Sequence, residues 1–241
     1  MRYYLDAVMS GSAAEIRLND VPVVRWGIGG ISVRCCVNMW VVPGLNVVTL
    51  KQIPPKENLD SENAAQVSMT LRKSVDNDPE RSVIILERNQ VFTEAFFECD
   101  SSEFPVRPAW LDLPVLTSAD IKAIRDFVGE FHEAVRACNS DKVLEYVELS
   151  LKAGATAFGF DLQAHRARYQ ELINELFEDR NFQVAPLAEN EFDFPLCGDG
   201  RLLSIVRPDG SDVIRSLNHE SGEWSLPLFI GIVDGRPLVV A

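Results

Sequence analysis

The chain has 241 residues, of which 46% are hydrophobic, and its formal net charge is -13. This size and apolar content are those of a globular protein with room for two modest domains. No apolar run reaches the roughly eighteen residues that a membrane helix needs. The opening MRYYLDAVMS also lacks the continuous apolar stretch of a secretory signal. We therefore expect a cytoplasmic protein that does not bind membranes.

The negative charge is concentrated in the second half of the chain. Residues 111–241 carry 22 acidic and 12 basic side chains, whereas residues 1–110 carry 14 and 11. An acidic surface repels the phosphates of nucleic acids and attracts basic proteins. We therefore expect no nucleic-acid partner and consider a basic protein partner. The alternative is that the acidity only keeps the protein dispersed in solution.

The cysteines and histidines do not form a recognisable site. The five cysteines include the adjacent pair Cys35-Cys36 and no CxxC spacing, so neither a disulfide framework nor a zinc site is expected. His132-Glu133 begins like the HExxH motif of zinc proteases, but Arg136 stands where the second histidine is needed. We expect reduced, mostly buried thiols, no metal and no cofactor.

The first hundred residues predict an all-β region. Apolar residues recur at every second position in short segments that are broken by Gly, Pro, Asn and Asp. Ile16 and Leu18 alternate with Glu15 and Arg17, so we expect one buried and one solvated face in that strand. Further strands are predicted at 21–26, 32–42, 47–51, 67–72, 83–86 and 91–99. Strands at this spacing are typical of a two-layered sandwich with jelly-roll-like connections.

Two stretches within residues 14–53 resemble a known family. The sequence pattern of IRLNDVPVVRW, followed by WVVPGLNVVTLKQI, is similar to that of the galactose-binding-like jelly-roll sandwiches that accompany many glycoside hydrolases. The matching residues fall in turns at Asn19-Asp20 and at 43–46, so the resemblance implies a fold and not ligand contacts. Sugar binding would require exposed aromatic side chains, for which the candidates are Trp26, Trp40 and Trp110. The alternative is that these tryptophans belong to a core or an interface.

A proline-rich segment follows the β region and predicts the domain organisation. Residues 103–116, EFPVRPAWLDLPVL, contain three prolines with apolar residues between them, whereas a flexible linker would be polar. We expect an extended linker that lies against both domains, with the side chains of Phe104, Trp110 and Leu113 packed against them. The predicted division is a β-sandwich domain at 1–103, a packed linker at 104–117 and a second domain at 118–241.

Three helices are predicted at the start of the second domain. In the first, over 117–138, apolar residues recur at steps of three and four, and Thr117 with Asp120 has the form of a capping box. The second begins after Asn139 and is expected to end at Gly154, because glycine commonly closes helices. The third begins near residue 161.

After the third helix, apolar residues again recur at every second position, which predicts an antiparallel sheet. Strands are expected at 182–187, 201–207, 212–218, 224–233 and 237–241, with Asp-Gly turns between several of them. Helices followed by such a meander give an α+β order. Residues 118–241, with the ending WSLPLFIGIVDGRPLVV, resemble the nuclear transport factor two-like, or ketosteroid-isomerase-like, cone fold. The small strand of that fold between its second and third helices would fall at Ala155–Phe160.

The cone resemblance implies a pocket, for which the ligand candidates are His165, Tyr169 and Trp224. His165 and Tyr169 lie one turn apart on the apolar stripe of the third helix, so both could face the pocket. The alternative is that His165 is a hydrogen-bonded core histidine. Enzymes of this family hold an acid-base pair in the pocket, but no such pair is identified in this sequence, so no catalytic residue is assigned.

Alternating acids at Glu189, Glu191 and Asp193 are candidates for a partner-binding surface. Phe194 occupies the position at which a calcium-binding loop requires glycine, so we do not expect a metal there. A solvated loop is the simplest interpretation.

Three functions follow from these patterns. The first is a non-catalytic interaction protein whose acidic second domain recognises a basic partner, for example to neutralise a toxic enzyme. The second is a small-molecule carrier or an enzyme that uses the pocket of the cone fold. The third is carbohydrate binding by the first domain. The sequence does not specify the oligomeric state.

Overall fold

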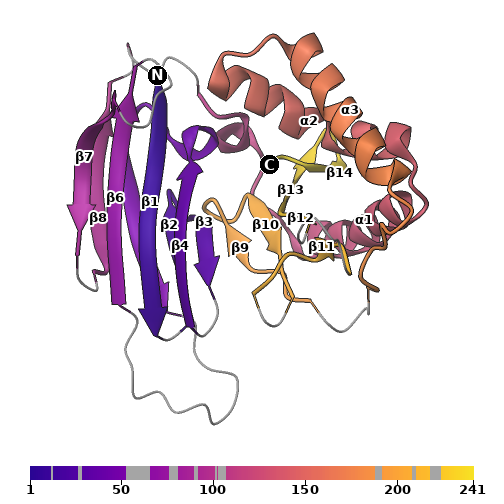
Figure 1. Cartoon of the computed structure of the whole chain (residues 1–241), viewed down its shortest axis with the longest axis horizontal. Helices are drawn as coiled ribbons and strands as arrows, with labels where there is room; N and C mark the ends of the chain where they lie inside the picture. Colours follow the sequence, from indigo (N-terminus) through magenta and orange to yellow (C-terminus); the bar gives the residue numbers. More distant parts are fainter. Residues whose placement is uncertain are drawn as a thin grey trace. The chain divides into compact units, whose positions relative to one another are not determined.

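The computed structural model describes residues 1–11, 13–26, 29–52, 66–75, 81–89, 92–100, 102, 107–187, 192–207, 210–217 and 224–241 (Figure 1). The protein has mixed α+β content, with strands in its N-terminal part and helices followed by strands in its C-terminal part. Backbone contacts group the chain into two units, Met1–Pro108 and Ala109–Ala241. Within these described ranges, no helix is both long enough and apolar enough to cross a membrane.

The described residues of the first unit form two four-stranded antiparallel sheets, with strand orders β4-β1-β6-β7 and β3-β2-β5-β8. The strands are β1 (Arg2–Gly11), β2 (Ala14–Leu18), β3 (Val21–Trp26), β4 (Gly29–Cys36), β5 (Gly44–Gln52), β6 (Gln66–Ser74), β7 (Val83–Arg88) and β8 (Glu94–Cys99).

The inner faces of the two sheets pack against each other. Tyr3 on β1 lies 6.1 Å from Phe97 on β8 between ring centroids, and its hydroxyl group is 3.0 Å from the sulfur of Cys99. Alternate residues are buried in β6, as in Val67, Met69 and Leu71, and in β8. The predicted period of two therefore corresponds to the burial pattern of these strands.

Two turns of the first unit have defined causes. Asn19 and Asp20 join β2 to β3 with φ values of 51° and 64°, the left-handed pair that a two-residue hairpin requires. The strand predicted over 32–42 is too long. β4 ends at Cys36, and Asn38–Trp40 form a 3-10 helix in which the buried Asn38 side chain accepts a hydrogen bond from the backbone of Tyr3, 2.7 Å away.

The prediction of a solvated face on β2 is wrong. Glu15 and Arg17 are each only 5% exposed. The guanidinium of Arg17 donates to Glu15 at 2.5 Å and to Asp20 at 2.6 Å, and Arg25 on β3 donates to Glu15 at 3.0 Å. These ion pairs compensate for the loss of solvation, which is the condition under which charged residues are buried.

The second unit begins with a 3-10 helix, Ala109–Asp112, which is followed by the three α-helices α1 (Ser118–Arg136), α2 (Ser140–Phe158) and α3 (Leu162–Glu178). The predicted capping box at the start of α1 is present: the backbone N–H of Asp120 donates to the Thr117 hydroxyl, and the Asp120 carboxylate accepts from the Thr117 backbone. At the other end, Cys138 takes a left-handed conformation with φ of 52°. The backbone N–H of Cys138 bonds to Val135 and that of Asn139 to Ala134, which is the Schellman pattern.

Gly154 does not end α2, contrary to expectation. The helix continues to Phe158 and ends at Gly159, which has φ of 68°. A Cβ atom on Gly154 would lie 3.4 Å from Nε2 of His165, so this glycine allows close packing of α3 on α2. The small strand expected at Ala155–Phe160 is also absent, because its first four residues belong to α2.

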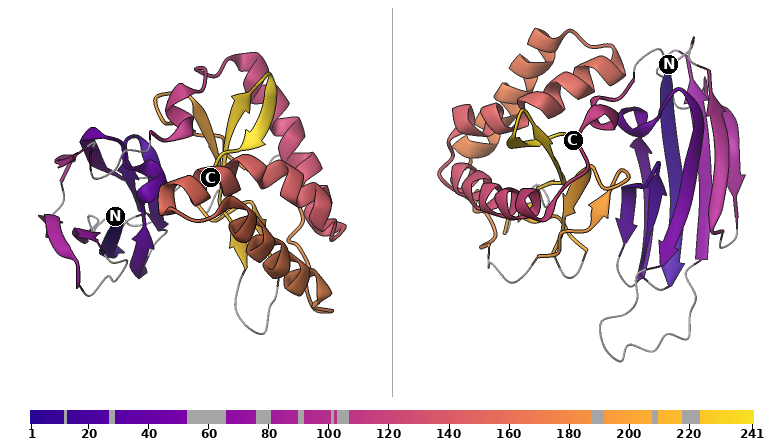
Figure 2. Two further views of the ribbon diagram at one scale, coloured as in Figure 1. Left: turned by 90° about the horizontal axis from the view of Figure 1, so that it is seen from above. Right: turned by 180° about the vertical axis from the view of Figure 1, so that it is seen from behind.

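A four-stranded antiparallel sheet of order β14-β13-β10-β9 and the hairpin β11-β12 complete the second unit. The strands are β9 (Leu196–Cys197), β10 (Leu202–Ile205), β11 (Ile214–Arg215), β12 (Ser225–Leu226), β13 (Leu228–Val233) and β14 (Arg236–Val239). The segment 182–187 is not a strand, and only Val184 forms a bridge, to Ser216. Figure 2 shows the helices and strands β13 and β14 from two further sides.

Both faces of β13 are covered. Ile230 and Ile232 point into a core cluster that they share with α1 and α2. On the opposite face, Gly231 packs against Leu113, whose terminal carbon lies 2.5 Å from the position that a Cβ on Gly231 would occupy. The Leu113 carbonyl also accepts a hydrogen bond of 2.6 Å from Arg201. The linker residues from Ala109 onward are therefore part of the second unit.

Candidate functional site

The pocket candidates His165 and Tyr169 lie one turn apart on α3 but contact different neighbours. The His165 ring is 5.4 Å from the ring of Phe160 and lies beside Gly154. Tyr169 packs against the core cluster, and burial raises the pKa of its hydroxyl group. A phenol with a raised pKa remains neutral at physiological pH, so Tyr169 can donate a hydrogen bond but is not poised to act as a base.

Trp224 also lies at the edge of the core cluster, and its position is fixed by Ser216. The backbone N–H of Trp224 donates to the Ser216 hydroxyl at 2.9 Å, and its carbonyl accepts from the Ser216 backbone at 2.8 Å. The indole ring meets Phe182 edge-on at 5.8 Å, and Phe182 contacts Phe177 at 5.6 Å. This row of aromatic rings gives Trp224 a clear packing role.

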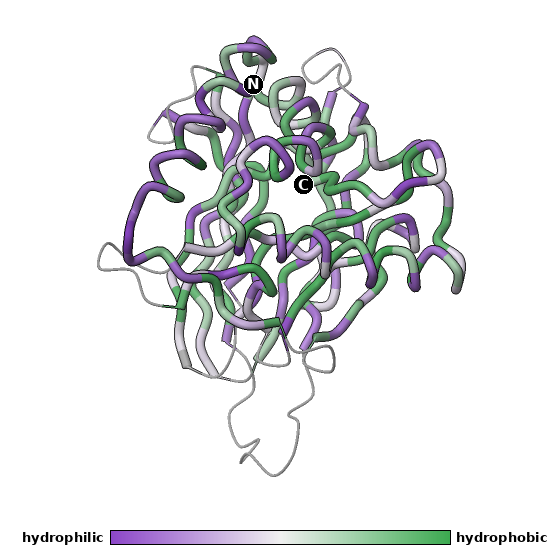
Figure 3. Tube along the Cα trace, turned by 90° about the vertical axis from the view of Figure 1, so that its right-hand side faces the viewer, coloured by the Kyte–Doolittle hydropathy of each residue, from purple (hydrophilic) through white to green (hydrophobic). Residues whose placement is uncertain are grey.

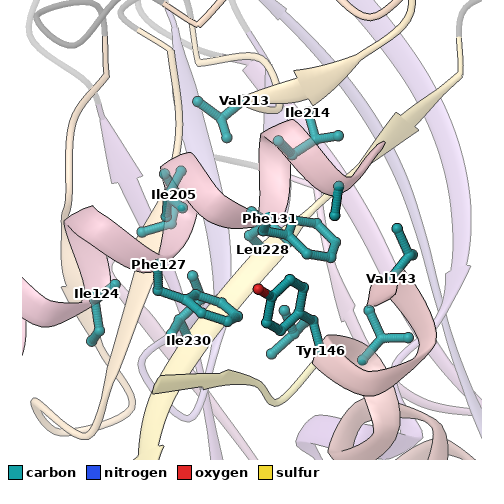
Figure 4. Packing of buried hydrophobic residues seen from close by; sticks show 14 of the residues in the cluster. Ile124, Phe127, Phe131, Val143, Tyr146, Ile205, Val213, Ile214, Leu228 and Ile230 are labelled. Carbon is teal, nitrogen blue, oxygen red and sulfur yellow. The ribbon is translucent and has the colours of Figure 1, made fainter. Parts of the chain in front are cut away.

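Aromatic side chains occupy the middle of the core cluster between α1 and α2. The Tyr146 ring lies 4.9 Å from Phe127 and 5.7 Å from Phe131, and Figure 4 shows the three rings turned toward one another. The Tyr146 hydroxyl group donates to Glu130 at 3.3 Å. These residues pack as a hydrophobic core does, and the buried members of the cluster are apolar apart from the Tyr146 hydroxyl.

Of the three acids predicted as a partner surface, Glu189 and Glu191 lie outside the described residues. Asp193 has an exposed side chain, and its backbone pairs with Val206 through hydrogen bonds of 2.8 Å and 3.2 Å. The structure therefore positions Asp193 beside β10.

A second group of acids, which the sequence analysis did not single out, lies on α3. Glu171, Glu175 and Glu178 are exposed and are spaced at i, i+4 and i+7, which places them on one face of the helix. We call these three residues the acidic stripe. Leu172, which is 46% exposed, lies beside them. Figure 3 shows hydrophilic and hydrophobic residues alternating along the helices.

The last turn of α3 carries charges that oppose the helix dipole, whereas the N-cap Asp161 is favourably placed at the other end. The last turn holds Glu175 and Glu178 and no basic residue, and the first turn holds no acid. Carboxylates are unfavourable at the negative C-terminal end of a helix. By contrast, α1 has Asp120 in its first turn and Arg136 in its last. Glu171 is paired with Arg168 at 3.0 Å within the helix, but helix stability does not account for Glu175 and Glu178.

The ion pairs of the first unit connect residues of its strands and serve its structure. Burial acts to raise the pKa of Glu15, but Arg17 and Arg25 outweigh it and the pKa lies below its ordinary value. Asp6 on β1 behaves alike: it is bonded to Arg34 on β4 and to Arg72 on β6, and its pKa is lowered. Carboxylates that are held ionised in this way are poor proton donors at neutral pH.

His132 and Cys35 are also placed for structure. His132 is 4% exposed, and its Nε2 lies 2.9 Å from the Ala185 carbonyl, to which it donates. Burial, with smaller contributions from Cys36 and Asp6, raises the pKa of Cys35 to about 12, so this thiol is unreactive. Across the described ranges, no three His, Cys, Asp or Glu side chains are grouped to hold a metal ion.

The aromatic residues considered for sugar binding are buried. Trp26, Trp40 and Trp110 are 6%, 8% and 3% exposed. In the described part of the first unit, Phe96 is the aromatic side chain with substantial exposure, at 51%. Stacking on a sugar requires an accessible ring face, so the three tryptophans do not offer such a site.

Comparison of the chain with family models, with curated proteins and with solved structures gives no match.

Proposed function

We propose that this protein is a non-catalytic cytoplasmic interaction protein that recognises a basic protein partner through the acidic surface of its second unit. The acidic stripe on α3 is the centre of that surface. A partner with matching Lys or Arg side chains would be attracted at long range and oriented on contact. Neutralisation of a basic toxic enzyme is one role that fits this chemistry.

The single observation that carries the proposal is the placement of two exposed carboxylates, and no cation, in the last turn of α3. Glu175 and Glu178 face solvent at the end of the helix where their charge is least favourable. Natural proteins break such local rules chiefly at functional sites. Of the residues in α3, only Ile173 is buried, which leaves most of this helix available to a partner.

The experiment compares the wild-type chain with the double variant Glu175→Lys/Glu178→Lys as bait in the native cell extract, at low and high salt. We expect a basic protein to be retained by the wild type at low salt, lost at high salt and absent from the variant. Asp126→Lys/Asp141→Lys is the matched control, because it changes the net charge equally on exposed positions of α1 and α2. The proposal fails if no protein is retained or if the two double variants behave alike.

We further propose that the first unit is a jelly-roll-like sandwich of the galactose-binding-like type and that the second is related to the nuclear transport factor two-like cone. The two face-to-face sheets support the first assignment. The packing of α1 and α2 on β13 and β14 supports the second. An experimental structure that shows different strand connections in either unit would refute the corresponding assignment.

A further inference from the structure

An apolar patch lies on the outer face of the β5-β8 pair in the first unit. Leu45 and Phe96 are 58% and 51% exposed, and Val47 is half-buried. Val47 and Phe96 are directly opposite each other in the register, and Leu45 lies on the diagonal. Neighbours of this kind on one face of an antiparallel pair contact each other. We call these three residues the β5-β8 patch.

Two carboxylates flank the β5-β8 patch along the edge strand β8. Glu94 and Glu98 are two residues before and two residues after Phe96, so all three side chains point to the same face, and both acids are exposed. Among the described residues, neither acid forms an ion pair. Lys51 lies on the same face of β5, two residues beyond Thr49, which is paired with Glu94. The two carboxylates therefore present their charge to solvent on either side of an exposed aromatic ring.

The negative charges of Glu94 and Glu98 limit which kinds of molecule can bind the β5-β8 patch. A second copy of the chain, related by a two-fold axis through the patch, would bring Glu94 and Glu98 close to the same acids of its partner. Anionic lipid surfaces and nucleic acids would be repelled for the same reason. A cationic segment with an apolar side chain between its charges would complement both features of the surface.

We propose that the β5-β8 patch binds an extended basic segment of a partner protein, with Lys or Arg at positions i and i+4 and a large apolar residue at i+2. In an extended chain these three side chains share one face, and the two charges are separated by about 13 Å. Glu94 and Glu98 are separated by the same number of residues on β8. The cations bond to the two carboxylates, and the apolar side chain covers Phe96.

The test uses the whole chain, labelled with nitrogen-15, and three short synthetic peptides. The probe has the core Arg-Thr-Leu-Thr-Arg. Its controls are Arg-Thr-Ser-Thr-Arg, which lacks the apolar residue, and Glu-Thr-Leu-Thr-Glu, which reverses the charge. We expect the probe to shift the amide resonances of Leu45, Val47 and Phe96 in a saturable way. Each control peptide should bind at least about fivefold more weakly.

Variants identify the side chains responsible. Phe96→Ser should weaken binding of the probe by about tenfold. Glu94→Gln and Glu98→Gln should each weaken it by about threefold at low salt and have little effect at high salt. Val8→Ser is the matched control, because Val8 is similarly exposed, at 58% against 51% for Phe96, but lies on β1 in the other sheet. Leu45→Ser replaces Phe96→Ser if the latter does not fold.

Three results would overturn the proposal. The first is the absence of shifts at β5 and β8 with millimolar probe. The second is equal binding of the probe and either control peptide. The third is a concentration-dependent dimer that Phe96→Ser abolishes, which would assign the patch to a second copy of the chain. None of these results depends on α3, so the proposed function of the second unit is tested separately.

Discussion

The side-chain amide of Asn19 donates a hydrogen bond to the side-chain carbonyl oxygen of Asn46 across 2.8 Å. Asn19 lies in the turn between β2 and β3, and Asn46 lies at the start of β5. The oxygen of Asn46 also accepts from the backbone of Val42 at 2.8 Å, and its nitrogen donates to the carbonyls of Val42 and Gly44. This pair therefore ties a hairpin to the loop that enters the neighbouring strand.

Replacement of Asn46 by alanine should destabilise the protein by about 3 kcal/mol, because Asn46 is fully buried and several polar groups would lose their partner. Urea unfolding of Asn46→Ala measures this cost. In a double-mutant cycle with Asn19→Ala, the combined loss should fall short of the sum by about 1 kcal/mol. Strict additivity would show that the two asparagines act independently.

The Glu15 carboxylate should contribute to stability in a pH-dependent way. Its pKa is lower in the folded state than in the unfolded state, so its contribution is complete above the usual carboxyl range and disappears as the pH falls through the folded-state pKa. Glu15→Gln should therefore flatten the acid limb of the plot of unfolding free energy against pH. Arg17→Met should cost about 3 kcal/mol at neutral pH, because the buried carboxylate loses one of its two guanidinium partners. An unchanged acid limb in Glu15→Gln would contradict this account.

Gly231 should not tolerate a side chain. In Gly231→Ala the added methyl group would overlap the terminal carbon of Leu113, and Leu202 lies only 3.2 Å away. We expect a loss of about 1–3 kcal/mol in the free energy of unfolding. Leu113→Ala in the same chain should recover part of that loss by removing the clash, which thermal unfolding of the single and double variants can measure. If Leu113→Ala and Gly231→Ala are additive, the linker does not pack on β13 as described.

Two residues of the acidic stripe, Glu175 and Glu178, should cost stability. Glu175→Lys and Glu178→Lys place cations at the C-terminal end of α3, where the helix dipole favours them. Each should stabilise the protein by about 0.5 kcal/mol at low salt, and the gain should shrink as salt is added. Chemical denaturation at two salt concentrations measures the effect. A loss of stability in both variants would mean that local contacts of these side chains, and not the dipole, determine their energetics.

The sequence predicted the helices best, because their signals are local. The capping residues Thr117 and Asp120 and the apolar period of 3.6 residues locate α1 to within two residues of its observed ends. Gly154 misled the prediction because a glycine that ends a helix and a glycine that admits a neighbouring helix are identical in a single sequence. The continuation of α2 to Gly159 and the packing of His165 beside Gly154 distinguish the two cases.

The errors in the strands come from long-range pairing. The buried charges of Glu15 and Arg17 could not be anticipated without the register that brings Arg25 opposite Glu15. The two candidate surfaces could likewise be predicted from the sequence only in part. The i, i+4, i+7 spacing of the acidic stripe was readable from the sequence, whereas the β5-β8 patch depends on the cross-strand pairing of Val47 with Phe96.

Cys138, the left-handed residue that ends α1, is suited to selective chemical labelling. Cys138 is exposed, whereas the other four cysteines are buried or half-buried. A maleimide-linked fluorophore or spin label would therefore react first at Cys138 and leave the interior thiols unmodified. Backbone hydrogen bonds from Cys138 to Val135 and from Asn139 to Ala134 tie this corner to the last turn of α1. A dye attached there would follow the tumbling of the second unit, so its anisotropy would report the arrival of a partner without any engineered substitution.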